Sequence, residues 1–127
     1  MHIEHIAIWT HQLEALKIFY ENYFAARANQ KYTNPKTHFE SYFLTFAVGP
    51  RLELMQRPDI EDTQSDGQKI GYTHLAFSVR SKKEVDRLTQ QLEADGYQVV
   101  GQPRITGDGY YESVILDPDG NRVEITV

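Results

Sequence analysis

The sequence contains two pairs of similar segments, and this repetition constrains its fold more than any other feature. HIAIW at residues 5–9 resembles HLAFS at 74–78, and RLEL at residues 51–54 resembles RVEI at 122–125. Both pairs are separated by about 70 residues and occur in the same order, which indicates an internal duplication. We therefore expect two copies of one supersecondary module.

The duplication divides the chain of 127 residues into two modules joined by a polar connector. Module one covers residues 1–57, the connector 58–71 and module two 72–127. The connector contains proline, aspartate, serine and glycine, and a long stretch of this composition is typical of a link between structural units. Because the whole chain has the size of one ordinary domain, we expect a single domain built from two half-domains.

Each module predicts the same order of elements, which is a strand, a helix and three further strands. Thr10 offers a side-chain oxygen to cap the first helix, and Ser81 begins a capping box with Glu84. Gly96 is expected to end the second helix because glycine readily adopts positive φ. The apolar residues at helical spacing are Leu13, Leu16 and Tyr20 in one helix, and Val85, Leu88 and Leu92 in the other. The expected strands span residues 5–9, 28–33, 39–48, 51–56, 74–79, 97–100, 110–116 and 122–127. The predicted fold class is α+β.

Composition excludes several classes of protein. The chain has no cysteine, so disulfides, thiolate metal ligands and cysteine nucleophiles are excluded. A net charge of −5 argues against binding nucleic acid through its phosphates. No apolar run is long enough to span a membrane, and the N-terminus does not resemble a secretory signal. We expect a cytoplasmic protein whose partner is a small molecule.

In each of four strands, the alternation of side chains places one imidazole or one carboxylate on the face opposite the apolar side chains. His5 and His74 occupy equivalent positions in the two opening strands, and Glu53 and Glu124 do so in the two closing strands. Side chains of a strand point to opposite faces in turn, so each of these four lies away from its apolar neighbours. If the modules pack with approximate twofold symmetry, the two imidazoles and two carboxylates can converge on one point.

This set of donors suits a borderline divalent cation. Imidazole nitrogen and carboxylate oxygen without sulfur favour Zn²⁺, Ni²⁺, Co²⁺, Fe²⁺ or Mn²⁺. Calcium would require more oxygen ligands, and magnesium rarely binds imidazole. The sequence therefore predicts a metal site with room for water or substrate oxygens.

Each candidate ligand also has an ordinary structural interpretation. A single histidine beside an apolar run is usually a hydrogen-bonded structural residue, and a single glutamate on a strand usually faces solvent. The repeated placement at equivalent positions favours the metal site. His2, His11 and His38 have no counterpart in the other module, so we expect them to be surface residues.

Other residues carry weaker indications. Trp9 shares the face of His5 and is a candidate wall of a substrate pocket, although a packing role fits equally well. Tyr110, Tyr111 or Glu112 could point toward the site, but core filling is the favoured interpretation of this stretch. The sequence contains neither a phosphate-binding loop motif nor a nucleophile-elbow motif.

The chain resembles the vicinal oxygen chelate superfamily, which contains glyoxalase I, bleomycin-resistance proteins and extradiol dioxygenases. The resemblance covers essentially the whole length and rests on the stretches HIAIW, LEALKIFYENYF, RLELM, THLAFSV and LDPDGNRVEIT. It implies two βαβββ modules that form a cupped mixed sheet with the helices outside. Such proteins often bind their metal at a dimer interface.

Within the superfamily the chain looks most like glyoxalase I (lactoylglutathione lyase), especially the nickel-using bacterial type. The resemblance implies His5, Glu53, His74 and Glu124 as metal ligands, with Glu124 as general base and Glu53 as the second carboxylate. The metal would be Ni²⁺ or Zn²⁺. Glyoxalase I usually has a basic residue soon after the first ligand to hold a glutathione carboxylate, whereas this chain has Trp9. We expect a more apolar site than glutathione requires.

Three kinds of function remain open from the sequence. The first is a metal-dependent lyase or isomerase that acts on a vicinal-dioxygen substrate through an enediolate. The second is another metalloenzyme of the superfamily, such as a dioxygenase or a thiol transferase. The third is a non-enzymatic protein that binds a small molecule or antibiotic. An open sheet with exposed edges and an apolar face also predicts a homodimer.

Overall fold

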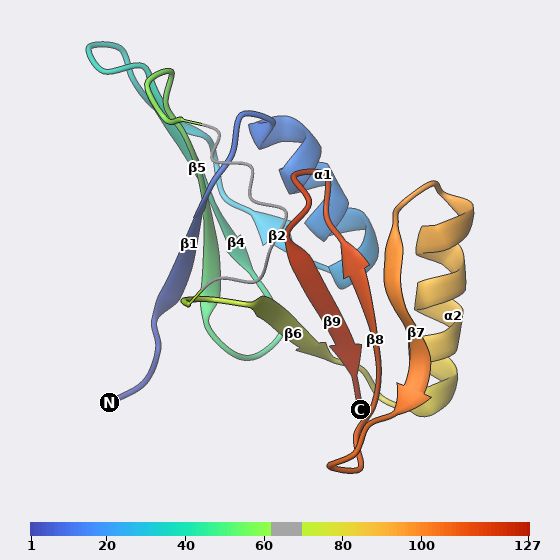
Figure 1. The fold of residues 1–127 in the computed structure, drawn as a ribbon. Coiled ribbons are helices and arrows are strands. Elements are labelled where there is room, and N and C mark those ends of the chain that lie inside the picture. Colours follow the sequence, from blue (N-terminus) through green and yellow to red (C-terminus); the bar gives the residue numbers. More distant parts are fainter. Residues whose placement is uncertain (62–69) are drawn as a thin grey trace. The chain divides into compact units, whose positions relative to one another are not determined.

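The computed structural model describes residues 1–61 and 70–127 (Figure 1). The chain forms two compact units, Met1–Gln64 and Ser65–Val127. The expected connector, residues 58–71, falls for the most part on residues 62–69, which lie outside the described residues. Across the part of the chain that is described, no helix has the length and apolar character needed to cross a membrane.

The first unit consists of one helix and a mixed sheet. In chain order its elements are β1 (His5–Trp9), α1 (Leu13–Phe24), β2 (Arg27–Ala28), β3 (Tyr32–Asn34), β4 (Phe39–Thr45) and β5 (Arg51–Gln56). The sheet order is β1-β5-β4-β2, and β3 also pairs with β4. Strands β1 and β5 are parallel, whereas the other pairs are antiparallel.

The second unit repeats this plan. Its elements are β6 (His74–Ser78), α2 (Lys82–Ala94), β7 (Val99–Ile105), β8 (Tyr111–Leu116) and β9 (Arg122–Thr126), and its sheet order is β6-β9-β8-β7. The opening and closing strands β6 and β9 are again parallel neighbours. The predicted α+β class with two βαβββ modules is confirmed.

In each unit the helix covers one face of its own sheet, and the candidate histidine and glutamate lie on the other face. The buried helix residues are Leu13, Leu16, Phe19 and Tyr20 in α1, and Val85, Leu88, Thr89 and Leu92 in α2. They pack against buried strand residues, namely Leu44, Leu52 and Leu54 in unit one, and Ile115, Val123 and Ile125 in unit two. Each fully buried aliphatic or aromatic side chain contributes about 1.5–3 kcal/mol relative to an exposed one. This apolar face fixes which side of each strand carries the polar groups.

The strand expected at residues 28–33 is divided into β2 and β3. Both pair with β4, but the register shifts by one residue between Ala28 and Tyr32. The backbone N–H of Phe43 donates to the side-chain oxygen of Asn29 at 2.8 Å instead of to a backbone carbonyl. A side chain that replaces a ladder partner interrupts the strand, so the prediction of one continuous strand was wrong.

The two helices begin differently. Thr10 does not cap α1, because its hydroxyl oxygen accepts from the N–H of Gln12, one residue before the helix. The N–H of Leu13 donates instead to the side-chain oxygen of Gln56 at 3.2 Å, a partner distant in sequence. In α2, by contrast, Ser81 accepts from the N–H of Glu84 as predicted. The positive φ of 93° at Gly96, just beyond α2, is confirmed as well.

The remaining boundaries differ most at β7. This strand spans Val99–Ile105 rather than residues 97–100, and its pairing with β8 contains two register shifts. It contains Pro103, which lacks an N–H group and is tolerated because β7 is the edge of its sheet. Strand β4 ends at Thr45 instead of continuing to residue 48.

Candidate metal and substrate site

The parallel strands of unit one bring His5 and Glu53 together. Ala7 lies opposite Glu53 and His5 opposite Arg51, so the imidazole and the carboxylate occupy the same face, which is opposite to Leu52 and the helix. Nε2 of His5 is 3.8 Å from Oε2 of Glu53. The His5 side chain is 40% exposed and that of Glu53 is 16% exposed, so a small molecule can reach the pair.

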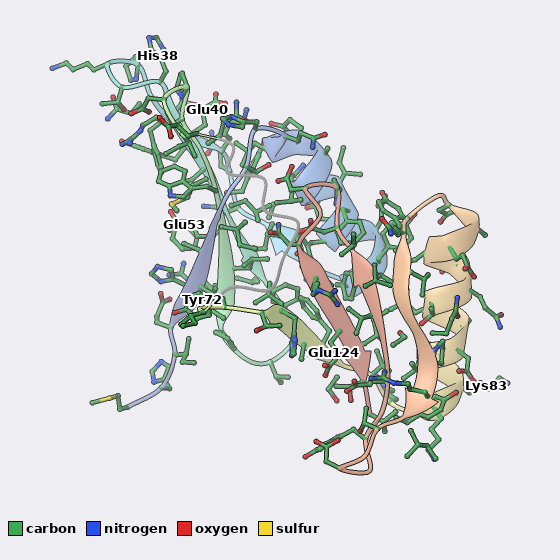
Figure 2. The ribbon with its side chains drawn as sticks, in the orientation of Figure 1. His38, Glu40, Glu53, Tyr72, Lys83 and Glu124 are labelled. Atoms are coloured by element: carbon green, nitrogen blue, oxygen red, sulfur yellow. The ribbon has the colours of Figure 1, made fainter. Side chains whose placement is uncertain are left out.

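Unit two contains the same arrangement at the same register. Ala76 lies opposite Glu124 and His74 opposite Arg122. Nε2 of His74 is 3.4 Å from Oε2 of Glu124, and the exposures of the two side chains, 40% and 14%, match those of the first pair. The duplication detected in the sequence is therefore repeated at the level of individual side chains. Glu53 on β5 and Glu124 on β9 are labelled in Figure 2.

The geometry of each pair fits a divalent cation bound by one nitrogen and one oxygen. Two atoms that each lie about 2.1 Å from one ion are about 3.0 Å apart at a right angle and about 3.4 Å apart at a tetrahedral angle. The Nε2–Oε2 distance of 3.4 Å in unit two equals the tetrahedral value. The corresponding distance of 3.8 Å in unit one exceeds that value by a few tenths of an ångström. Among residues 1–61 and 70–127, no three potential ligands lie together closely enough to hold an ion. The gathering of all four around one ion remains a prediction.

The carboxyl group of Glu124 is in an unusual electrostatic environment. Burial raises its pKa above the ordinary value of 4.5, and the negative charge of Glu112 raises it further. The imidazole of His74 acts in the opposite direction, and Asp108 adds a smaller raising effect. Glu112 is itself partly neutralised by Arg104, whose Nη1 lies 3.6 Å from Oε1 of Glu112. A carboxylate with a raised pKa is a stronger base at neutral pH than an ordinary one.

Glu112 was only one of three residues that the sequence offered as pointing toward the site, and core filling was the favoured interpretation of residues 110–112. That interpretation fails for Tyr110 and Glu112, whereas Tyr111 lies on the helix-facing side of β8. Tyr110 is 55% exposed, and the hydroxyl of Tyr111 donates to Asp86 on α2 at 2.6 Å. Glu112 lies opposite Thr126 on the face of Glu124. The register of β8 against β9 would have revealed this, because residues opposite each other share a face.

The face around the first pair is aromatic. Trp9, which is 41% exposed, meets the ring of Phe39 edge-on at 6.1 Å, and Tyr32 contacts the same ring. The guanidinium group of Arg57 lies 5.5 Å from the centre of the Trp9 ring. These side chains provide an aromatic surface with one guanidinium group beside it.

The first imidazole also has contacts that the sequence analysis did not anticipate. Its ring meets that of Phe43 edge-on at 5.5 Å, and its Nδ1 lies 2.5 Å from Oε2 of Glu4. Arg51 completes the group by pairing with the same carboxylate. Glu4 immediately precedes His5, so its adjacency was the available signal.

A model of the Glyoxalase/Bleomycin resistance protein/Dioxygenase superfamily matches residues 2–125. The chain belongs to this superfamily. The name of the superfamily covers enzymes as well as a resistance protein, so membership by itself does not specify an activity.

The chain is also similar to individual proteins. The uncharacterized protein YqjT of Bacillus subtilis (strain 168) is 42% identical over 60 residues, a match that covers 45% of this chain and 47% of that protein. A glyoxalase I mutant from Zea mays has a TM-score of 0.76 at 21% identity, over 98% of this chain and 44% of the maize chain. The chain thus spans about half the length of each. Lactoylglutathione lyase from Agrobacterium tumefaciens has a TM-score of 0.67 at 25% identity, covering 98% and 91% of the two chains.

Proposed function

We propose that the chain is a metal-dependent lyase or isomerase of the glyoxalase I type, acting on a small vicinal-dioxygen substrate through an enediolate. The observation that carries this proposal is the His–Glu pair repeated at one register in both units, at 3.8 and 3.4 Å. Membership of the superfamily supports it. His5, Glu53, His74 and Glu124 would together hold one ion, for which Ni²⁺ or Zn²⁺ is the first choice and Fe²⁺, Co²⁺ or Mn²⁺ are alternatives.

In this proposal the two carboxylates have different roles. A bound divalent ion would stabilise the negative charge that develops on the two adjacent oxygens of the substrate. Glu124 removes the proton from the neighbouring carbon and returns it to the other carbon, a role worth about 10²–10⁴-fold in rate. Burial and Glu112, which raise the pKa of Glu124, suit it to this role. Glu53 serves as the second carboxylate ligand.

The substrate that we propose has an apolar or aromatic part. Trp9 occupies the region where glyoxalase I usually places a basic residue, and its ring is accessible beside Phe39. An indole face binds a planar apolar group better than it binds a carboxylate. Trp9 is therefore proposed to form a wall of the substrate pocket.

Metal content and turnover test the proposal together. The purified chain is stripped of metal, loaded with Ni²⁺, Zn²⁺ or Fe²⁺, and assayed with the hemithioacetal of methylglyoxal and glutathione and with those of aromatic α-oxoaldehydes. We expect turnover only after loading, and we expect Glu124→Gln to lower it by about 10²–10⁴-fold. Failure to bind any of these ions would contradict the proposal.

Other activities within the superfamily would give different results in the same experiment. Oxygen uptake with a catechol after Fe²⁺ loading would identify a dioxygenase. Addition of a thiol to an electrophilic substrate would identify a thiol transferase. Tight binding of an aromatic drug by the metal-free protein, without turnover, would identify a binding protein.

We also propose that the protein forms a homodimer. Ile18 on α1 is 50% exposed and Val48 after β4 is 85% exposed, so apolar surface is available for pairing. Light scattering at micromolar concentration should give twice the mass of 14.7 kDa. A monomer at that concentration would contradict this expectation.

A further inference from the structure

The carboxylate of Glu4 bridges the first imidazole and a guanidinium group. Its Oε2 lies 2.5 Å from Nδ1 of His5, and its Oε1 accepts from Nε of Arg51 at 2.7 Å. A second guanidinium nitrogen of Arg51 pairs with the same oxygen. Both carboxylate oxygens are therefore occupied by partners in unit one.

Several contacts hold this carboxylate in place. The backbone N–H of Arg51 donates to the carbonyl of Glu4 at 3.0 Å, which fixes the main chain at the start of β1. The guanidinium group of Arg51 lies 4.1 Å from the centre of the Phe43 ring, and this contact limits its rotation. Paired with the guanidinium group of Arg51, the Glu4 side chain is in its carboxylate form at neutral pH, as glutamates ordinarily are.

An ionised carboxylate can only accept hydrogen bonds, and this decides which imidazole nitrogen carries the proton. Nδ1 of His5 must donate to Glu4, so in the neutral ring Nε2 keeps its lone pair, on the side of Glu53. The edge-on contact with Phe43 holds the plane of the ring. A carboxylate that accepts from the second nitrogen of a ligating histidine fixes its tautomer and increases its basicity.

We propose that Glu4 is a positioning residue that fixes His5 as the Nδ1–H tautomer, which makes His5 a stronger and better oriented metal ligand than His74. The metal-binding part rests on the proposed function, whereas the tautomer is a property of the metal-free chain.

Within residues 70–127, the second unit has no equivalent of this arrangement. Thr73 takes the place of Glu4, and Val114, opposite Glu124, takes the place of Phe43. Among the residues that the structure describes, His74 has an ion-pair partner at Nε2, which is Glu124, but no carboxylate at Nδ1. His74 therefore serves as an internal control within the same molecule.

The tautomers can be read directly in the metal-free, full-length protein. Long-range ¹H–¹⁵N spectra are recorded at about pH 8.5, because the two tautomers are distinguished in neutral imidazole rings and the ordinary histidine pKa is about 6.5. We expect Nδ1–H for His5 and predominantly Nε2–H for His74. Glu4→Gln keeps an acceptor oxygen and should retain Nδ1–H, whereas Glu4→Ala should shift His5 toward Nε2–H.

Calorimetric titration with Ni²⁺ measures the consequence for binding. Glu4→Ala should weaken binding by about 10–100-fold, the usual effect of removing such a partner, and Glu4→Gln should fall between it and wild type. Two control variants should bind as wild type does. Thr73→Ala alters the equivalent position of unit two, and Glu93→Gln removes one negative charge from the exposed side of α2.

The two measurements separate this inference from the proposed function. Nε2–H at His5 in the wild type, or a spectrum unchanged by Glu4→Ala, would overturn the role of Glu4. Wild-type affinity in Glu4→Ala would overturn its effect on the ligand. If the wild type binds no metal, the proposed function and the metal-binding part fail, whereas the Nδ1–H tautomer and its loss in Glu4→Ala would still support the role of Glu4 at His5.

Discussion

The two units place a histidine and a glutamate at the same register but surround each pair differently. Beside the first pair lie the Phe43 ring and, through Glu4, the Arg51 guanidinium group. Beside the second pair lies Glu112, whose negative charge raises the pKa of Glu124. The first pair is thus held by aromatic and cationic contacts, and the second is in an acidic environment. This difference supports the roles that we propose, namely ligand orientation in unit one and proton transfer in unit two.

The helix-facing sides of the two sheets differ as well. Tyr42 and Ser113 occupy equivalent positions, opposite Leu54 and Ile125 respectively. The Tyr42 hydroxyl donates to Glu14 on α1 at 3.1 Å, whereas Ser113 is fully buried and hydrogen-bonds to Thr89 on α2 at 2.6 Å. One unit uses charge at the edge of its core, and the other uses two neutral hydroxyls inside it. The repeated backbone therefore leaves individual contacts free to differ.

The largest expected effect distinguishes the two carboxylates. At saturating Ni²⁺, Glu124→Gln should lower kcat by about 10²–10⁴-fold, because it removes the proposed general base while keeping an oxygen that can bind metal. Glu53→Gln should affect metal affinity more than kcat. Steady-state kinetics of both variants with the preferred substrate provides the measurement. A larger loss of kcat in Glu53→Gln than in Glu124→Gln would show that Glu53 is the general base.

The next prediction concerns whether the two pairs act as one site. If four ligands share one ion, calorimetry should give one Ni²⁺ per chain. His5→Ala and His74→Ala should then each weaken binding by more than the roughly 100-fold expected from an outer partner. Two ions per chain, with each variant losing one of them, would show that the pairs act separately.

Removal of one aromatic side chain from the surface around the first pair is expected to have a smaller effect than the loss of a metal ligand. Trp9→Ala should raise KM for a substrate with an aromatic part by about tenfold, since an aromatic pair contributes about 0.5–1.5 kcal/mol beyond its buried area. Ser78 ends β6 as Trp9 ends β1, so Ser78→Ala is the matched control and should leave KM unchanged. Equal KM values for Trp9→Ala and wild type would show that Trp9 does not line the substrate pocket.

The buried hydroxyl pair of unit two allows a test of stability. The Thr89 hydroxyl donates to the carbonyl of Val85 at 2.6 Å, so Ser113 must be the donor in the bond between the two hydroxyls. Ser113→Ala should lower the free energy of unfolding by about 1 kcal/mol, as measured by urea denaturation.

Thr126→Val provides the contrast to Ser113→Ala. The Thr126 hydroxyl is buried and has no hydrogen-bond partner among the residues that the structure describes. Its removal should leave stability unchanged or increase it, since burying an unpaired polar group is unfavourable. Destabilisation by Thr126→Val as large as that by Ser113→Ala would contradict the interpretation of the Thr126 hydroxyl as an unpaired group.

The smallest effect is the acid sensitivity of unit one. The hydrogen bond from Lys31 holds the pKa of Glu14 below 4.5, so the pair stabilises the fold above that pH. This contribution is lost as the pH falls through the lowered pKa, because the carboxylate becomes protonated. Thermal unfolding followed by fluorescence of Trp9, the single tryptophan, should show a weaker pH dependence below pH 4.5 in Glu14→Gln. A slope equal to that of the wild type would mean that the pair contributes nothing.

Sequence patterns were most successful where one face of an element is buried. The apolar residues of α1 and α2 and the alternation in the opening and closing strands were predicted because burial requires that periodicity. Ser81 was identified because its partner lies three residues away. The start of α1 was missed because the N–H of Leu13 is satisfied by Gln56, more than forty residues away.

The neighbours of the candidate ligands depend on strand pairing and could not be read from the sequence. Glu112 lies on the face of Glu124 because β8 pairs with β9 at one particular register. Phe43 reaches His5 because β4 and β1 both flank β5. Local periodicity contains no information about which residues of separate strands lie opposite each other.

The sequence by itself determined the duplication, the α+β modules and the four residues that face away from the apolar core. These follow from short-range patterns, since alternation and helical spacing act over a few residues and are repeated in both halves. Only the tertiary structure decided that His5 is bound by Glu4 and Phe43 and that Glu112 acts on Glu124. Such contacts depend on rotamers and on strand register, which the packing of the whole sheet determines.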